Sequence, residues 1–246
     1  MEPVDPPTPA PTPGFVPTRW SLVAAAQGHS EPARAALGEL CQLYWYPLYA
    51  FVRRRGSSEP DAQEAVQAFF ADLLERDALL SADRARGRFR SFLLASLSNF
   101  LSHQREREQA LKRGGGKRPL SIDWLSAEER FRLEPASGET PERVFERAWA
   151  AALLERTLAR LEAEWEEKGR GTLFRVLRER LGDSSREVPS SEAARALKMN
   201  EQALRVTLHR LRKRYREILR EEVAQTVASA EDVEDELRAL FDTFSR

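Results

Sequence analysis

The stretch SSEAARALKMNEQALRVTLHRLRKRYR, residues 190–216, carries the strongest structural pattern in this chain of 246 residues. It opens with serine, a good helix cap, and continues as a short helical segment up to residue 197. A tight connection follows at 198–200, and Asn200 can cap the next helix. That longer helix places an apolar seam at alternating steps of four and three residues: Leu204, Leu208, Leu211, Tyr215 and Ile218.

A cationic ridge runs beside this seam with the same spacing. A short helix, a three-residue turn and a longer basic helix form the helix-turn-helix arrangement, whose second helix enters the major groove of DNA. Arginine can pair bidentately with guanine edges, while neighbouring cations neutralise phosphates. The plainer alternative is an amphipathic helix with a solvated basic face. The ridge consists of Arg205, His209, Arg212 and Arg216, widened by Arg210, Lys213 and Arg214.

Helical spacing of apolar residues recurs through the rest of the chain, over 40–52, 62–74, 89–101 and 144–165. Strand-like alternation over useful lengths is absent, and β-branched residues are sparse. We therefore predict an all-α protein. Phe92 and Phe100, at helical spacing, are interpreted as core residues rather than as stacking partners for bases.

Composition divides the chain into segments. Residues 1–17 hold seven prolines and should be extended or disordered. Residues 112–141 contain a run of three glycines and scattered prolines without periodicity, which predicts a linker or functional loop rather than a core element. We expect two small helical domains joined by this flexible linker, residues 18–111 and 142–220, the second containing the helix-turn-helix. Residues 221–246 form an acidic C-terminal extension.

The formal net charge is zero, but its distribution is uneven. Residues 84–118 hold ten Lys or Arg against two Glu, and residues 201–220 hold seven against two. Residues 221–246 hold eight Asp or Glu against two Arg. Two basic blocks are thus compatible with a nucleic-acid partner despite the neutral total.

Several classes of protein are disfavoured. Cys41 is the single cysteine, so no intrachain disulfide can form and a reducing cytoplasm is the expected setting. No apolar stretch is long enough to span a bilayer, and no secretory signal is evident, so we expect no membrane insertion. His29, His103 and His209 lie far apart, and neither metal-ligand spacing nor a phosphate-binding glycine motif is present. We expect no enzymatic activity, no cofactor and no metal.

Together with the helix-turn-helix, three further segments make residues 19–220 resemble the extracytoplasmic-function sigma factors, two-domain relatives of the bacterial housekeeping sigma factor. YPLYAF at 46–51 and DAQEAVQAFF at 61–70 are similar to that family's helices that bind the polymerase clamp. GRFRSFLL at 87–94, followed by Asn99, looks like the helix that opens and reads the upstream promoter element. The chain departs from the family pattern at Ala68, Ser98 and His103.

The resemblance implies a cytoplasmic, nucleoid-associated factor that binds core RNA polymerase at the clamp region of the β′ subunit and directs promoter recognition, DNA opening and transcription initiation. For polymerase binding it implies Asp61, Gln63, Glu64, Gln67 and Phe70. For the upstream element it implies Arg88, Arg90, Asn99, His103 and Arg105. For the distal element it implies Gln202, Arg205, Val206, Thr207, His209, Arg210, Arg212 and Lys213.

Two other functions are alternatives to that of a sigma factor. A helix-turn-helix repressor or activator that is not a polymerase subunit explains residues 190–216 equally well, but leaves the basic first domain and the long linker unexplained. An enzyme would need a distinctive pairing of a carboxylate with histidine or cysteine, which the sequence lacks. The acidic extension is expected to fold against the cationic second domain or to engage a regulator, such as an anti-sigma factor, and so to restrain DNA binding.

Overall fold

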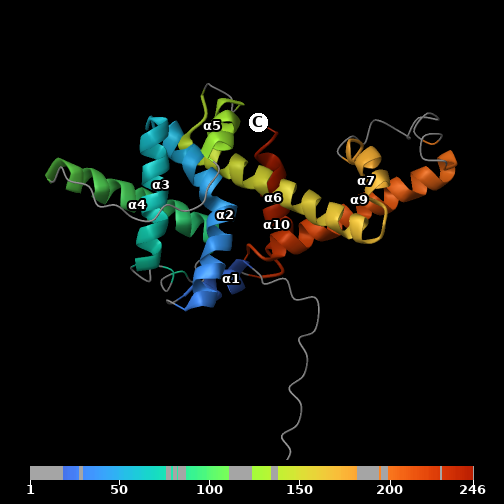
Figure 1. Ribbon diagram of the computed structural model, residues 1–246, viewed down its shortest axis with the longest axis horizontal. Coiled ribbons are helices and arrows are strands. Elements are labelled where there is room, and N and C mark those ends of the chain that lie inside the picture. Colours follow the sequence, from blue (N-terminus) through green and yellow to red (C-terminus); the bar gives the residue numbers. More distant parts are fainter. Residues whose placement is uncertain are drawn as a thin grey trace, which may run out of the picture.

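The computed structural model describes residues 19–27, 30–75, 79, 82, 87–110, 124–133, 138–181, 194, 199–227 and 229–245, and this part of the chain is helical without strands (Figure 1). The predicted all-α class is confirmed for these residues. The proline-rich tail, residues 1–17, lies outside them. In order along the chain, the helices are α1 Arg19–Ala25, α2 Glu31–Arg54, α3 Glu59–Glu75, α4 Phe89–Ala110, α5 Trp124–Leu133, α6 Pro141–Glu167, α7 Gly171–Arg178, α9 Glu201–Ala224 and α10 Val233–Asp242.

Helix α2 is the central element of the larger core, and its ends follow from local chemistry. The Ser30 side chain accepts a hydrogen bond from the Ala33 amide (3.3 Å), which satisfies a backbone donor that the first turn leaves unpaired. Arg53 and Arg54 lie in the last turn, where cations interact favourably with the helix dipole. Gly56 then adopts a φ of 92°, a conformation that glycine adopts without the steric cost of a Cβ.

Helices α1, α3 and α4 pack their apolar residues into a core around α2. Trp20 from α1 and Tyr44 from α2 both meet Phe89 of α4 edge to face, with ring centroids 5.7 and 5.5 Å apart. Phe92 and Phe100 pack against this core as partly buried residues, which confirms their interpretation as packing residues.

The same core continues into helices that follow the predicted linker. Val144, Phe145 and Trp149, in the first half of α6, are buried in one cluster with α2. Val223 at the end of α9 and Leu240 of α10 join that cluster. The structure therefore does not show the predicted split into two domains, because segments on both sides of residues 112–141 contribute to one apolar interior.

The segment predicted to be a linker contains helix α5. Ala127 is fully buried in the main core, so the expectation of a segment without any core element is wrong over this stretch. Glu128 explains how the helix is held. Its carboxylate accepts hydrogen bonds from the Tyr49 hydroxyl (2.6 Å) and from two nitrogens of Arg53 (2.9 and 3.1 Å). A helix of ten residues that is held partly by such polar contacts leaves little apolar periodicity in the sequence.

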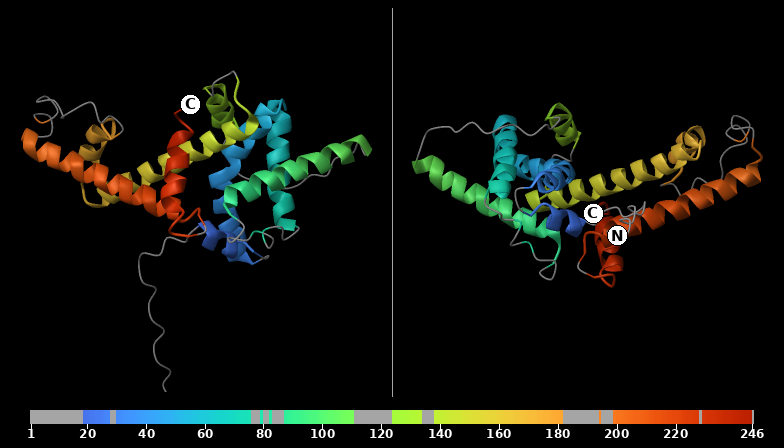
Figure 2. Two further views of the ribbon diagram at one scale, coloured as in Figure 1. Left: turned by 180° about the vertical axis from the view of Figure 1, so that it is seen from behind. Right: turned by 60° about the horizontal axis from the view of Figure 1, so that its bottom comes forward.

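A second, smaller core joins the far half of α6 to α7 and α9. Figures 1 and 2 show α6 running outward from the α2 core to this end of the molecule, with α9 returning along it. Leu204, Leu208, Leu211 and Ile218 are buried here and Tyr215 is partly buried, which confirms the predicted seam of α9. Within the described part of the chain, no helix combines the length and the apolarity needed to cross a membrane.

Candidate nucleic-acid interface

Helix α9 presents the candidate surface. One of its sides packs against other helices, so the opposite side is exposed. Asn200 caps its first turn by accepting a hydrogen bond from the Ala203 amide at 2.6 Å, as expected from the sequence. The apolar seam then faces α6 and α7. The opposite side of the helix carries exposed cations from residue 205 to residue 216.

The structure brings most of the residues predicted for the distal promoter element to this exposed side. Thr207 is half-buried, and its hydroxyl donates to the Ala203 carbonyl at 2.7 Å. Arg212 is also half-buried and donates to the Arg180 carbonyl at 2.8 Å, which ties α9 to the end of α7. The exposed members are Gln202, Arg205, Val206, His209, Arg210 and Lys213.

The first helix of the predicted helix-turn-helix falls almost wholly outside the described residues. Ala194 is the exception, and it is buried in the same small core as Leu204. The Met199 amide donates to the Ala194 carbonyl at 2.9 Å, a bond spanning five residues as in the closure of a helix C-terminus. The helix-turn-helix itself is not shown and remains a prediction.

Not every cation of α9 belongs to the exposed surface. Arg214 forms a two-pronged pair with Glu164 of α6, with nitrogen–oxygen distances of 2.7 and 2.9 Å. The hydrogen bonds that Arg214 donates to the Glu164 carboxylate lower the pKa of Glu164 below its ordinary value and raise the pKa of Arg214. This arginine, predicted to widen the basic ridge, instead braces α9 against α6.

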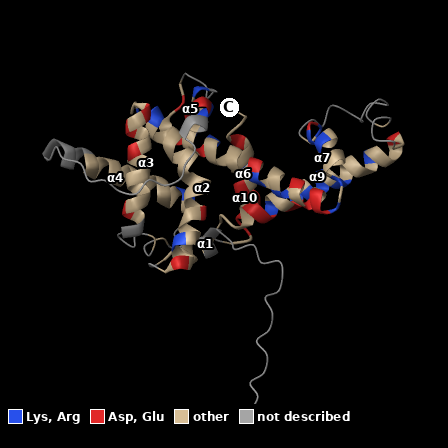
Figure 3. Ribbon diagram, in the orientation of Figure 1, with Lys and Arg blue, Asp and Glu red and all other residues tan. Residues whose placement is uncertain are grey.

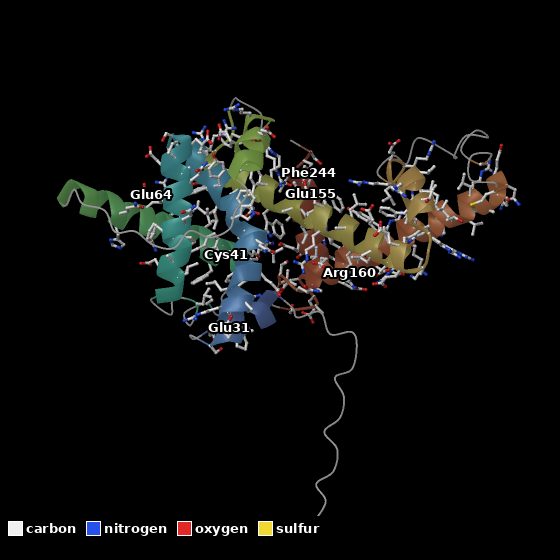
Figure 4. All side chains as sticks on the ribbon, in the orientation of Figure 1. Glu31, Cys41, Glu64, Glu155, Arg160 and Phe244 are labelled. Carbon is white, nitrogen blue, oxygen red and sulfur yellow. The ribbon has the colours of Figure 1, made fainter. Side chains whose placement is uncertain are left out.

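Further along, the C-terminal half of α9 is held to α6 by a second set of ion pairs. Arg156 contacts Glu222 at 3.1 Å, and Arg160 contacts both Glu222 (3.4 Å) and Glu221. Figure 4 places Arg160 where the two helices run side by side. Charges of both signs alternate along α6 and α9 in Figure 3, so the contact between the helices is strongly polar at its edges. These pairs fix the direction in which the basic face of α9 points.

On α3, the residues predicted to bind polymerase divide between surface and core. Asp61 and Glu64 are exposed, and Figure 4 shows Glu64 on the outer side of the helix. Gln63 and Gln67 are half-buried. Phe70 is only 1% exposed and packs in the main core, so its predicted contact with a partner would require this packing to open.

The residues predicted for the upstream element divide in the same way. Asn99 and His103 are exposed on α4, and Arg88, which precedes the helix, is 41% exposed. The side chain of Arg105 lies outside the described residues. Arg90 is only 4% exposed, and the structure therefore corrects its expected placement on a DNA-facing surface.

Arg90 is buried because two other helices, α6 and α10, supply it with partners. Its Nε donates to Glu146 of α6 at 2.7 Å, and its terminal nitrogens reach Glu236 of α10. The guanidinium also lies over the Trp149 ring, 4.0 Å from the centroid. The sequence offered one signal for this cluster. Glu236 falls three residues after Val233 and four before Leu240, both buried, and so lies on the apolar stripe of its own helix.

Comparisons with protein-family models, with curated proteins and with solved structures gave no match. The exposed basic face of α9 and the polar outer faces of α3 and α4 are therefore the observations from which a function follows. Among the described residues, no group of three or more histidine, cysteine or acidic side chains could hold a metal ion.

Proposed function

We propose that this protein is a sigma factor of the extracytoplasmic-function type, which binds core RNA polymerase and directs promoter recognition, DNA opening and transcription initiation. The observation that carries the proposal is the exposed cationic face of α9, held outward by a fully packed opposite face. The resemblance of the segments at 46–51, 61–70 and 87–94 to the family supports it.

The geometry of α9 suits a helix that reads a major groove. From Gln202 to Arg216 the exposed side is about 21 Å long at 1.5 Å per residue, comparable to several base pairs. Exposed Arg205 and Arg210 supply the planar fork that pairs with guanine, while Lys213 and Arg216 supply charge for phosphates. Because Glu164 neutralises Arg214, the outward-facing charge of this stretch comes from Arg205, Arg210, Lys213 and Arg216.

In this proposal α3 and α4 have separate tasks. Asp61 and Glu64 offer carboxylates to the polymerase clamp from the outer face of α3. Asn99 and His103 lie on the exposed side of α4, where they contact the upstream element. Capturing an unpaired base costs a few kcal/mol of lost stacking, so polymerase must contribute binding energy and the free protein should bind DNA weakly.

A second candidate is a helix-turn-helix regulator that is not a polymerase subunit, and the face of α9 favours it equally. The two candidates differ in what α3 does. A sigma factor needs the exposed carboxylate of Glu64 for polymerase, whereas a simple DNA-binding regulator does not.

The experiment that separates the two measures affinity for purified bacterial core RNA polymerase. Glu64→Ala and Gln67→Ala should weaken binding of the full chain to the polymerase while leaving its helical content unchanged. Glu31→Ala is the matched control, because Glu31 is an exposed carboxylate at the opposite end of the α2–α3 group (Figure 4). Failure of the unmodified chain to bind core polymerase would contradict the proposal and favour the regulator.

A further inference from the structure

The C-terminal helix α10 is packed against the body of the protein rather than projecting from it. Its buried side consists of Val233, Glu236 and Leu240, the first and last of which belong to the main core. Its N-terminal turn is tied to α9 by an ion pair between Glu234 and Arg220. The acidic extension thus reaches α9 and, in addition, the core built around α2.

Glu236 is the unusual residue of this helix because its carboxylate is completely buried. A buried carboxylate is costly unless opposite charge and hydrogen bonds compensate it. Two arginines do so, Arg88 through its Nε at 2.9 Å and Arg90 through both terminal nitrogens. Both come from the segment at 87–94, which precedes and opens α4.

Arg90 cannot serve Glu236 and a DNA phosphate at the same time, whereas Arg88 contacts Glu236 through its Nε and its side chain stays 41% exposed. Pairing with a buried carboxylate neutralises the charge of a guanidinium and occupies the donors that form the pair. Arg90 is further enclosed by Glu146 and by the Trp149 ring. While α10 is in place, Arg90 is covered, although Asn99 and His103 on the same helix stay exposed.

We propose that α10 is an autoinhibitory element: Glu236 acts as an internal substitute for DNA phosphate, holding Arg88 and Arg90 until α10 is displaced. The inference rests on the proposed function, in which the start of α4 contacts promoter DNA. Displacing α10 leaves Arg88 without its carboxylate partner and Arg90 paired with Glu146 alone, next to the exposed polar residues of α4, so that a DNA phosphate can take the place of Glu236.

The test uses the full chain and two readouts. Glu236→Gln keeps the shape of the side chain and removes the charge that holds the arginines. Asp235→Asn is the matched control, since it removes one acidic charge from the same helix, where Asp235 is exposed and pairs with Arg238 at 2.7 Å. Phenylglyoxal labelling followed by peptide mass spectrometry reports whether Arg88 and Arg90 are accessible. Fluorescence anisotropy measures binding to a DNA duplex that contains an unpaired bubble.

Glu236→Gln should increase labelling of Arg88 and Arg90 and tighten binding to the bubble DNA by about tenfold, with a steeper salt dependence equivalent to about one or two more phosphate contacts. Asp235→Asn should leave both readouts at the wild-type level. Circular dichroism checks that the helices persist. If Glu236→Gln unfolds the chain, Glu234→Gln, which removes the exposed ion pair between α10 and Arg220, should increase the labelling of Arg88 and Arg90 in the same direction.

Unchanged labelling would show that Glu236 does not hold the arginines, and increased labelling without tighter DNA binding would show that they do not contact DNA. Either result overturns autoinhibition. Arg205→Ala in the same assay keeps this failure distinguishable from failure of the proposed function. If Arg205→Ala weakens binding while Glu236→Gln changes nothing, DNA binding by α9 stands and only the role of α10 is rejected.

Discussion

Glu128 illustrates at the scale of single residues how charge is used inside this protein. Its side chain is 10% exposed, and it accepts hydrogen bonds from Tyr49 and Arg53. The hydrogen bond from Arg53 is the largest cause that lowers the pKa of Glu128 below its ordinary value of 4.5. The ionised carboxylate therefore contributes to holding α5 on α2.

We predict that Glu128→Gln lowers the free energy of unfolding at neutral pH by about 1–3 kcal/mol, because it leaves Arg53 without its charged partner. Since the pKa is lowered in the folded state, the contribution is present above pH 4.5 and is lost as pH falls through the folded pKa below it. Urea unfolding of both proteins at pH 7 and at pH 3 measures this. A stability difference that stayed constant with pH would contradict the assignment.

The interior of the molecule was harder to predict at this scale than its surface. From the sequence alone, Arg90 is one more cation of a basic block. Counting charges along the chain does not reveal which acidic residues the fold will bring next to it. Its partners Glu146 and Glu236 are 56 and 146 residues away. Only contacts between distant segments decide that it is buried.

At the scale of elements, α9 was the most predictable part of the chain. An apolar seam over five positions, an asparagine cap and a cationic ridge are all local patterns, and the structure confirms the cap and the buried seam. Helix α5 was missed because its anchoring depends on Glu128, Tyr49 and Arg53, and the latter two belong to a distant segment. The periodicity of apolar residues within a segment does not reveal its contacts with a distant segment.

Substitution of the exposed arginines of α9 and of the paired arginine should give different phenotypes. Arg205→Ala and Arg210→Ala should each weaken DNA binding by about 1–3 kcal/mol if the side chain reads a base, with little effect on stability. Arg214→Ala should instead lower stability, because Glu164 loses its partner. Anisotropy with promoter DNA and urea unfolding measure the two effects, with Arg143→Ala, an exposed arginine of α6, as the control. Unchanged DNA binding by both Arg205→Ala and Arg210→Ala would indicate a solvated face rather than an interface.

At the scale of the whole molecule, the main finding is a core shared by segments on both sides of residues 112–141. Composition suggested a boundary there, since glycine and proline interrupt the helical pattern. Composition could not indicate that α6 returns to pack along α2, because that depends on complementary apolar faces in separate helices. Trp149 lies at the centre of this contact, fully surrounded and covered by Arg90.

Trp149→Ala should therefore lower the free energy of unfolding by about 3–5 kcal/mol, the usual cost of removing a large buried aromatic side chain. The effect should spread to both sides of the shared core. Hydrogen exchange followed by mass spectrometry should show faster exchange in α2 and in α10 together, in addition to α6. Faster exchange confined to α6 would contradict a shared core.

We propose that the chain makes core polymerase start transcription at promoters. Run-off transcription with purified bacterial core RNA polymerase on genomic fragments tests it most directly. We predict RNA products with defined start positions that depend on the added protein and are lost in the Arg205→Ala, Arg210→Ala double variant. If the unmodified chain produces no defined start on any fragment while a known sigma factor does so with the same polymerase, the protein is not a sigma factor.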